Sequence, residues 1–350
     1  MLNLSKKTSW RIPTVIALGI ASLLPQMSSA QAPAKWPTQD ISIVVPYPPG
    51  GGTDLTTRAL AEEMGKALKT NISVINQPGA SGSVGTLAVW NKPHNGYTIS
   101  ANGILAFTSY PVRGFTEGVY KDQKDWHIWI ATYSPNAIVT KGGPDAKYKT
   151  MTDLLAALKA KPGEITFGTA GVGSGGHMGA EVLKLGTKIP YKHISYQGGA
   201  PAIVGGLSGE VDIVPQLLME MVDHIRAGKM NALAVLMDQP FKLSGAPDIP
   251  AITDSVPGVK PYLPMGESFG IMVPKDTPAN AVKAIDDAFK IAVQSETVKK
   301  FAAEKGSVVL ALSGEEAQAH VAKLSSIVSW TLFDGGAAKI SPDKLGIPKP

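Results

Sequence analysis

A short apolar run, a glycine-rich loop and a helical pattern follow one another several times along the chain, and no other property of the sequence limits the possible folds so strongly. The first copy runs from Ile41 to Val45, through loop 46–52, into apolar residues at helical spacing from Leu55 to Leu68. Short runs rich in β-branched residues are typical of strands buried on both faces of a parallel sheet. The pattern therefore predicts an α/β fold with mostly parallel sheets flanked by helices.

The same order returns later in the chain. Further glycine loops lie at 78–85, 170–177 and 197–201, each after an expected strand. Capping boxes at Thr150 with Asp153 and at Ser313 with Glu316 mark the starts of two helices. Besides 41–45, we expect strands over 71–76, 98–101, 165–169, 193–196, 211–214, 231–236 and 269–273, and further helices over 154–161, 178–185, 218–227, 279–294 and 313–333. Another helix should follow the glycine loop at 197–201, with Pro201 in its first turn.

The length of 350 residues favours two domains or one large one. Residues 246–264 are rich in proline and show no periodicity, which is typical of a crossing between domains. The amphipathic helices beyond this segment need a sheet to cover. We therefore expect the chain to return to its first domain, so that residues 31–135 and 265–350 form one part and residues 136–264 the other.

Residues 1–30 have the features of a cleaved export signal. Lys6, Lys7 and Arg11 precede the mostly apolar run 15–24, and small residues follow at 28–30. As a helix the apolar run would rise about 15 Å, too little to span a bilayer. Without this segment the chain has 30 basic and 28 acidic residues in no basic cluster, so we expect no nucleic-acid partner.

The chain contains no cysteine, which excludes disulfides, thiolate metal sites and a lipid-modified cysteine anchor. Its six histidines show no metal-ligand spacing, so no metal is expected. Gly171, Gly173 and Gly176 match the spacing of a dinucleotide fingerprint, but no acidic residue lies between Glu181 and Glu210 to bind the ribose. We therefore expect a soluble, monomeric, exported protein without a cofactor.

The glycine loops are the candidate binding elements. Amides in the first turn of a helix have no partner within the helix and carry about half a positive charge, and glycines allow a ligand to approach them closely. Open α/β sheets bind ligands at the carboxyl ends of their strands, where these loops lie. Several helix starts around one cleft could therefore hold a carboxylate. Only Arg58, Arg113 and Arg226 remain after cleavage, and none lies within these loops.

Seven segments that cover the mature chain in order carry a resemblance to a known family: 43–54, 76–82, 95–98, 171–177, 196–202, 209–212 and 273–278. In these segments the sequence resembles the Bug family of periplasmic solute receptors of tripartite tricarboxylate transporters. The resemblance implies a two-lobed periplasmic binding protein of type II with a hinge between the lobes. It also implies that the protein binds a small organic acid and passes it to a membrane permease.

The same resemblance implies which residues contact the ligand. From the first lobe these are Tyr47, Gly52, Thr53 and Asp54, supported by Ala80 and Gly82; from the second they are Gly173, Ser174, His177, Gly199 and Ala200. The stretch 102–110 is variable, and we expect Asn102 to influence which acid is accepted. Residues 267–270 depart from the family pattern, because Glu-Ser-Phe-Gly stands where relatives often have a tryptophan.

Two other functions remain open. Ser174 and His177 lie three residues apart at a helix start, so a periplasmic enzyme that uses them is one alternative. Asp54 and His177 could equally have structural roles, as a helix cap and a packed side chain. The second alternative is a sensor that presents its bound ligand to a receptor, and it would share the same site.

Overall fold

The structure is a computed structural model that describes residues 8–9, 35–119, 123–144 and 146–350. The expected export signal lies outside the described residues, apart from positions 8 and 9, and its cleavage stays a prediction. Residues 35–350 form one compact unit, to which the following description refers. In this part of the chain no helix has both the length and the apolar character that a membrane span requires.

The first part of this unit alternates strands and helices, as expected. Its elements are β1 (Ile41–Val45), α1 (Gly52–Leu68), β2 (Ile72–Asn76), the 3-10 turn η1 (Ala80–Gly82), α2 (Ser83–Trp90), β3 (Thr98–Gly103), α3 (Ile104–Thr108) and the 3-10 turn η2 (Gln123–Asp125). The strands confirm the predicted β-loop-α-β order. Helices α2 and α3 lie where the sequence analysis placed no helix.

The middle of the chain confirms the second set of predicted elements, with bounds that shift by a few residues. They are α4 (Met151–Ala160), β5 (Thr166–Thr169), α5 (Gly175–Thr187), β6 (Lys192–Ser195), α6 (Gly199–Ser208), β7 (Ile213–Leu217), α7 (Leu218–Arg226) and β8 (Met230–Val235). They are preceded by the long strand β4 (Trp126–Lys141), which was not predicted.

The aperiodic segment 246–264 contains the 3-10 turns η3 (Ile252–Asp254) and η4 (Pro257–Tyr262), and its residues Ile249 and Ala251 form isolated β-bridges. The last part of the chain consists of β9 (Gly266–Pro274), α8 (Ala279–Gln294), α9 (Glu296–Glu304), β10 (Val308–Leu312), α10 (Gly314–Asp334) and the 3-10 turn η5 (Pro342–Leu345). Here β9, α8 and α10 confirm the prediction, whereas α9 and β10 are additional.

The strands form one mixed sheet. Its order is β2-β1-β3-β9-β4-β7-β5-β6, and β8 and β10 also pair with β4. Parallel pairing joins β1 to β2 and β3, and β5 to β6 and β7. Every pair that involves β4 or β9 is antiparallel, so the expectation of mostly parallel sheets holds only on either side of this central pair.

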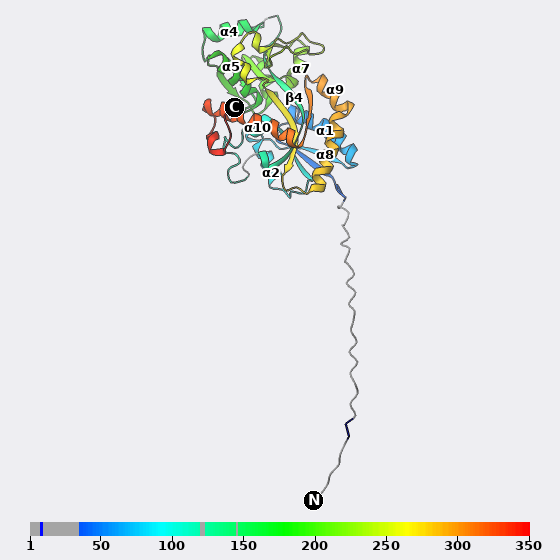
Figure 1. Cartoon of the computed structure of the whole chain (residues 1–350). Helices are drawn as coiled ribbons and strands as arrows, with labels where there is room; N and C mark the ends of the chain where they lie inside the picture. The colour runs from blue at the N-terminus through cyan, green and yellow to red at the C-terminus, as the bar shows by residue number, and fades with distance from the viewer. Residues whose placement is uncertain (1–7, 10–34, 120–122, 145) are drawn as a thin grey trace. The chain divides into compact units, whose positions relative to one another are not determined.

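Strand β4 connects the two sides of the sheet. It pairs with β9 from Trp126 to Pro135, and from Asn136 onward it pairs with β7. Figure 1 shows β4 running from the part that carries α1, α2 and α8 toward the part that carries α4, α5 and α7. The chain returns along β9, so two neighbouring antiparallel strands cross between the two sides.

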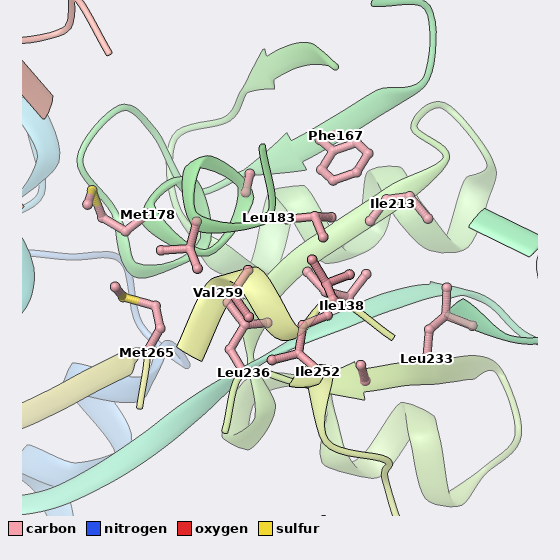
Figure 2. Packing of buried hydrophobic residues seen from close by; sticks show 14 of the residues in the cluster. Ile138, Phe167, Met178, Leu183, Ile213, Leu233, Leu236, Ile252, Val259 and Met265 are labelled. Carbon is pink, nitrogen blue, oxygen red and sulfur yellow. The ribbon is translucent and has the colours of Figure 1, made fainter. Parts of the chain in front are cut away.

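Each side of the sheet has its own hydrophobic core. On the first side, residues of β1, α1, β9 and α8 pack together, among them Ile43, Met64 and Phe289. On the second side, Figure 2 shows side chains from β4, α5, β7 and η4 pointing toward one another around Ile138 and Val259. These cores hold the strand ends and the following loops in fixed positions.

The two predicted capping boxes have different outcomes. Thr150 and Asp153 form the complete box at the start of α4, as predicted. At the start of α10 the prediction is wrong, because the side chain of Ser313 caps no helical amide. It instead forms a hydrogen bond with the carboxylate of Asp286 on α8. A partner from a neighbouring helix thus replaces the local one.

Candidate ligand-binding site

A cavity of about 60 Å³ lies where the loops after β1, β5 and β6 meet the first turn of α7 and strand β9. Its walls come from both sides of the sheet: residues 47–49, 51–53, 103, 106, 170, 174, 175, 198–201, 216, 217, 220, 267 and 269. The loops that follow parallel strands leave the sheet at its carboxyl edge, which explains why glycine loops far apart in sequence converge here.

The start of α1 forms one wall of this cavity. A β-carbon on Gly52 would lie 2.6 Å from Cζ of Phe269 and 2.9 Å from Sδ of Met219, so a glycine is needed for this close approach. The amide of Gly52 donates a hydrogen bond of 2.8 Å to Oε1 of Glu220. The helix start that we expected to face a ligand therefore already binds a carboxylate from α7.

Glu220 lies between two helix starts. Nε2 of Gln216 donates to its Oε2 at 2.5 Å, and a β-carbon on Gly199, at the start of α6, would overlap both side chains. Burial raises the pKa of Glu220 above its ordinary value, although the hydrogen bonds from Gly52 and Gln216 oppose this shift. Its carboxylate occupies the kind of position that we predicted for a ligand carboxylate.

Glu267 on β9 is the second carboxyl group in the wall. Its side chain is only 4% exposed, and its Oε1 accepts a hydrogen bond of 2.7 Å from the amide of Leu105. Burial raises the pKa of Glu267 to about 8. Amides of Leu105, Ala106 and Ser268 oppose this shift, whereas the negative charge of Glu220 adds to it.

Sequence reasoning missed both carboxyl groups as site residues. For Glu267 a signal existed, because it belongs to the segment 267–270 that departs from the family pattern. For Glu220 no motif was available: it is one acidic residue in the first turn of a helix, a common position for a structural carboxylate.

A second cavity of about 430 Å³ adjoins the first and shares Tyr47, Pro48, Ala170 and Gly198 with it. We call the two cavities together the cleft. The second cavity is lined by residues 46–48, 78–82, 113, 170–172 and 195–198. The hydroxyl of Tyr47 donates a hydrogen bond of 3.0 Å to the carbonyl of Ser81 and so fixes this loop.

Arg113 contributes a positive charge to the second cavity. Its guanidinium carbon lies 4.3 Å from the centroid of the Phe115 ring. Its Nη1 is buried without a hydrogen-bond partner among the described residues. Burial lowers the pKa of Arg113, which nevertheless stays charged because arginine is so strongly basic. Sequence reasoning set Arg113 aside because it lies outside the glycine loops.

Ser174 and His177 lie together at the start of α5, but their contacts are structural. Oγ of Ser174 accepts a hydrogen bond of 3.2 Å from the backbone amide of His177, and Nδ1 of the His177 ring accepts one of 3.2 Å from the amide of Gly173. The centroid of the His177 ring lies 4.6 Å from the centroid of the His193 ring. Burial, with the nearby His193, lowers the pKa of His177 to about 4. Ser174 is thus the N-cap of α5, and the ring of His177 packs against a second ring and accepts a hydrogen bond from a backbone amide.

Asp54 supports the loop before α1. Its carboxylate forms an ion pair of 2.9 Å with Arg58 and accepts hydrogen bonds from the amide of Gly50 at 2.9 Å and from Asn76 at 2.8 Å. Burial alone would raise its pKa, but these three partners together hold the pKa below its ordinary value. Asp54 therefore fixes the conformation of the glycine loop without lining either cavity.

Asn102 on β3 likewise does not line the cleft. Its Nδ2 donates a hydrogen bond of 2.7 Å to Oγ1 of Thr86, and the hydroxyl of Tyr110 donates one of 3.4 Å to its Oδ1. The side chain is fully buried and lines neither cavity. Tyr110 in turn donates a hydrogen bond of 3.0 Å to the carbonyl of Ser81, which lines the second cavity.

The twelve expected ligand contacts thus fall into three groups. The first cavity is lined by Tyr47, Gly52, Thr53, Ser174, Gly199 and Ala200. The second is lined by Ala80 and Gly82, again with Tyr47. The remaining four line neither cavity: Asp54, Asn102, Gly173 and His177. Their direct contact with a ligand stays a prediction, as does that of the lining residues.

Known proteins resemble the chain in sequence. A family model described as the tripartite tricarboxylate transporter family receptor matches residues 56–326. Protein BugT of Bordetella pertussis is 29% identical to the chain over 79% of its length and 83% of that protein. A protein of Agrobacterium vitis, encoded in the intergenic region between ttuE and ttuC' of TAR-I, is 29% identical over 90% of the chain and 90% of that protein.

Solved structures show the same fold. The periplasmic binding protein BugD aligns with a TM-score of 0.73 at 24% identity, over 90% of this chain and all of that one. An R. palustris protein solved with adipate aligns with a TM-score of 0.76 at 23% identity, over 87% of this chain and 99% of that one. MatC from Rhodopseudomonas palustris with bound malate aligns with a TM-score of 0.73 at 20% identity, over 84% of this chain and all of that one. The α/β periplasmic binding protein fold is therefore confirmed.

Proposed function

The chain belongs to the tripartite tricarboxylate transporter receptor family, whose model covers well over half of its length, and we propose that it captures a small organic carboxylate in the cleft and delivers it to the membrane subunits of such a transporter. The resemblance drawn from the motifs is thereby confirmed. Receptors of this family are periplasmic solute-binding proteins. Cleavage of residues 1–30 during export is part of the proposal.

The observation that carries this proposal is the cleft itself, in which loops and helix starts from both sides of the sheet meet around two adjoining cavities. The starts of α1, α5 and α6 all contribute to its wall. Two proteins of the same fold have been solved with the carboxylates adipate and malate. Both lines of support point to capture without covalent chemistry.

We also propose that the two sides of the sheet are lobes that close on the solute, residues 31–135 with 265–350 and residues 136–264. The change of β4 partners between Pro135 and Asn136 supports this division. A ligand can favour closure only by as much as it binds the closed state more tightly. Closure would strengthen each polar contact because it removes water from around it.

A thermal-shift screen against organic acids tests the proposal. A ligand present at a hundred times its Kd stabilises a protein by about 2.7 kcal/mol, so binding should raise the melting temperature clearly. In the Gly199→Ala variant the shift should be lost, because the new β-carbon would overlap the side chains of Glu220 and Gln216 in the cavity wall and displace them.

Gly258→Ala is the matched control, because a β-carbon there would meet only ordinary contacts, the nearest at 3.4 Å. A shift of unchanged size in Gly199→Ala would place the solute outside the cleft. Conversion of the acid into a product would instead support the enzyme that uses Ser174 and His177.

A further inference from the structure

The wall of the 60 Å³ cavity carries hydrogen-bond acceptors that lack a cationic partner. Glu220 and Glu267 both line it, and among the described lining residues there is no lysine, arginine or histidine. Gln216 also lines it, is only 2% exposed, and its Oε1 has no hydrogen-bond partner among the described residues. Two carboxyl groups, from α7 and β9, and the amide side chain of Gln216 on β7 thus line one small space.

These acceptors make the cavity a poor place for a second carboxylate. Burial and the negative charge of Glu220 both raise the pKa of Glu267, so Glu267 keeps its proton near neutral pH. A carboxylate that entered between the two side chains would add a further negative charge beside Glu220. A protonated amine would have the opposite effect, because it would donate hydrogen bonds to the carboxyl oxygens and stabilise their ionised forms.

The adjoining cavity has the opposite character. There Arg113 presents a guanidinium whose Nη1 is buried without a partner among the described residues. Tyr47 lines both cavities. Burial raises the pKa of its hydroxyl well above 10, the charge of Glu267 raises it further, and the charge of Arg113 lowers it. The cleft therefore has an acidic end and a basic end with one tyrosine between them.

We propose that the cleft selects a zwitterionic aminocarboxylate, whose protonated amine lies between Glu220 and Glu267 and whose carboxylate lies toward Arg113. The inference rests on the proposed function, because it takes the cleft as the solute site. It narrows the substrate class from organic acids in general to those that carry a cationic nitrogen. Glu220 and Glu267 are then the residues that determine specificity.

A purely structural role for the two carboxylates has a different consequence. Both accept hydrogen bonds from backbone amides, Glu220 from Gly52 and Glu267 from Leu105, and could simply hold those segments in place. In that case their replacement by glutamine would lower stability but leave the preference among ligands unchanged. The preference is therefore the measurement that separates the two roles.

Calorimetric titration of the mature chain, residues 31–350, provides the test. The probes are the common α-amino acids and the ω-amino acids from β-alanine to ε-aminohexanoate, each compared with the dicarboxylate of the same carbon number. We expect at least one aminocarboxylate to bind about tenfold or more tightly than its matched dicarboxylate. A dicarboxylate that binds in the cleft as tightly as every aminocarboxylate would overturn the inference but leave the proposed function intact.

The variants Glu220→Gln and Glu267→Gln should each reduce that preference by about tenfold, and Arg113→Met should weaken aminocarboxylates and dicarboxylates alike. Glu164→Gln, an exposed residue between α4 and β5, is the matched control and should leave the preference unchanged. If either glutamine variant fails to fold, the other variant and the unmodified chain still decide the question. An unchanged preference in the folded glutamine variants would show that the carboxylates are structural. If no probe of either class binds, both proposals fail.

Discussion

Glu267 and His177 are buried titratable groups whose pKa values are shifted toward their neutral forms. Burial raises the pKa of Glu267 to about 8 and lowers that of His177 to about 4. Between pH 4.5 and 8 the folded state therefore retains a proton on Glu267 that the unfolded chain releases, so this group stabilises the fold less as the pH rises. For His177 the stabilisation is lost as the pH falls from 6.5 to 4.

Between pH 7 and 8 Glu267 gives the clearest contribution, because its pKa of about 8 lies in this window while His177 is largely neutral in both the folded and the unfolded state. We expect the free energy of unfolding to fall over this window by up to about 1.4 kcal/mol per pH unit. Glu267→Gln, which cannot ionise, should flatten this dependence. Urea unfolding at both ends of the window measures it, and a slope that Glu267→Gln leaves unchanged would contradict the assignment.

Asp54 gives a prediction about the loop before α1. Asp54→Asn removes the ion pair with Arg58 and weakens the hydrogen bonds that hold Gly50 and Asn76. We expect a loss of about 1–3 kcal/mol in the free energy of unfolding, because buried hydrogen-bonding groups lose their charged partner. The matched control is Asp287→Asn on α8, whose pair with Lys283 is exposed and contributes little. Equal effects of the two changes on chemical denaturation would show that Asp54 has no special role.

How far single site residues can be predicted depends on where their contacts come from. Gly52 and Gly199 follow from the local order of strand, loop and helix, and both line the cavity. Glu220 and Glu267 enter the cavity only through packing of α7 and β9 against distant loops. A sequence without an alignment gives no sign of such long-range contacts.

Secondary-structure elements were predictable where their signal is local. Strand β1 is an almost continuous apolar run, and helix α4 has a complete capping box, and both appear as expected. Strand β4 was not predicted because it is stabilised by pairing with β7, β8, β9 and β10, which are all distant from it in sequence. The cap of α10 failed for a similar reason, because Ser313 found a partner on another helix.

The start of α4 offers a test of the local signals. Thr150→Ala removes the side-chain oxygen that accepts a hydrogen bond of 3.2 Å from the backbone amide of Asp153. We expect the free energy of unfolding to fall by about 1 kcal/mol, the usual cost of losing a helix cap. Ligand binding should not change, since α4 contributes nothing to the walls of the cleft.

Denaturant midpoints and a titration of the same variant check both statements. Ser313→Ala is the informative comparison, because that residue caps no amide of α10. Any loss of stability there should instead require Asp286, and it should vanish in a background that carries Asp286→Asn. A loss that persists in this background would show that Ser313 acts on its own helix.

The molecule as a whole combines two sides that are joined by β4 and β9. Because both strands are buried along almost their whole length, the crossing is firmly paired, and β9 also brings Glu267 to the wall of the cleft. This arrangement suits a receptor that binds between two lobes. An acidic end and a basic end of the cleft would then orient the solute before the lobes close.

The crystal structure of the mature chain with its tightest-binding solute tests this account most directly. We expect the solute between the starts of α1 and α6, with its nitrogen beside Glu220 and Glu267 and its carboxylate toward Arg113. A solute bound instead in the separate cavity of about 850 Å³ that β4, α8 and the start of α10 line, or with a carboxylate beside the two glutamates, would contradict it.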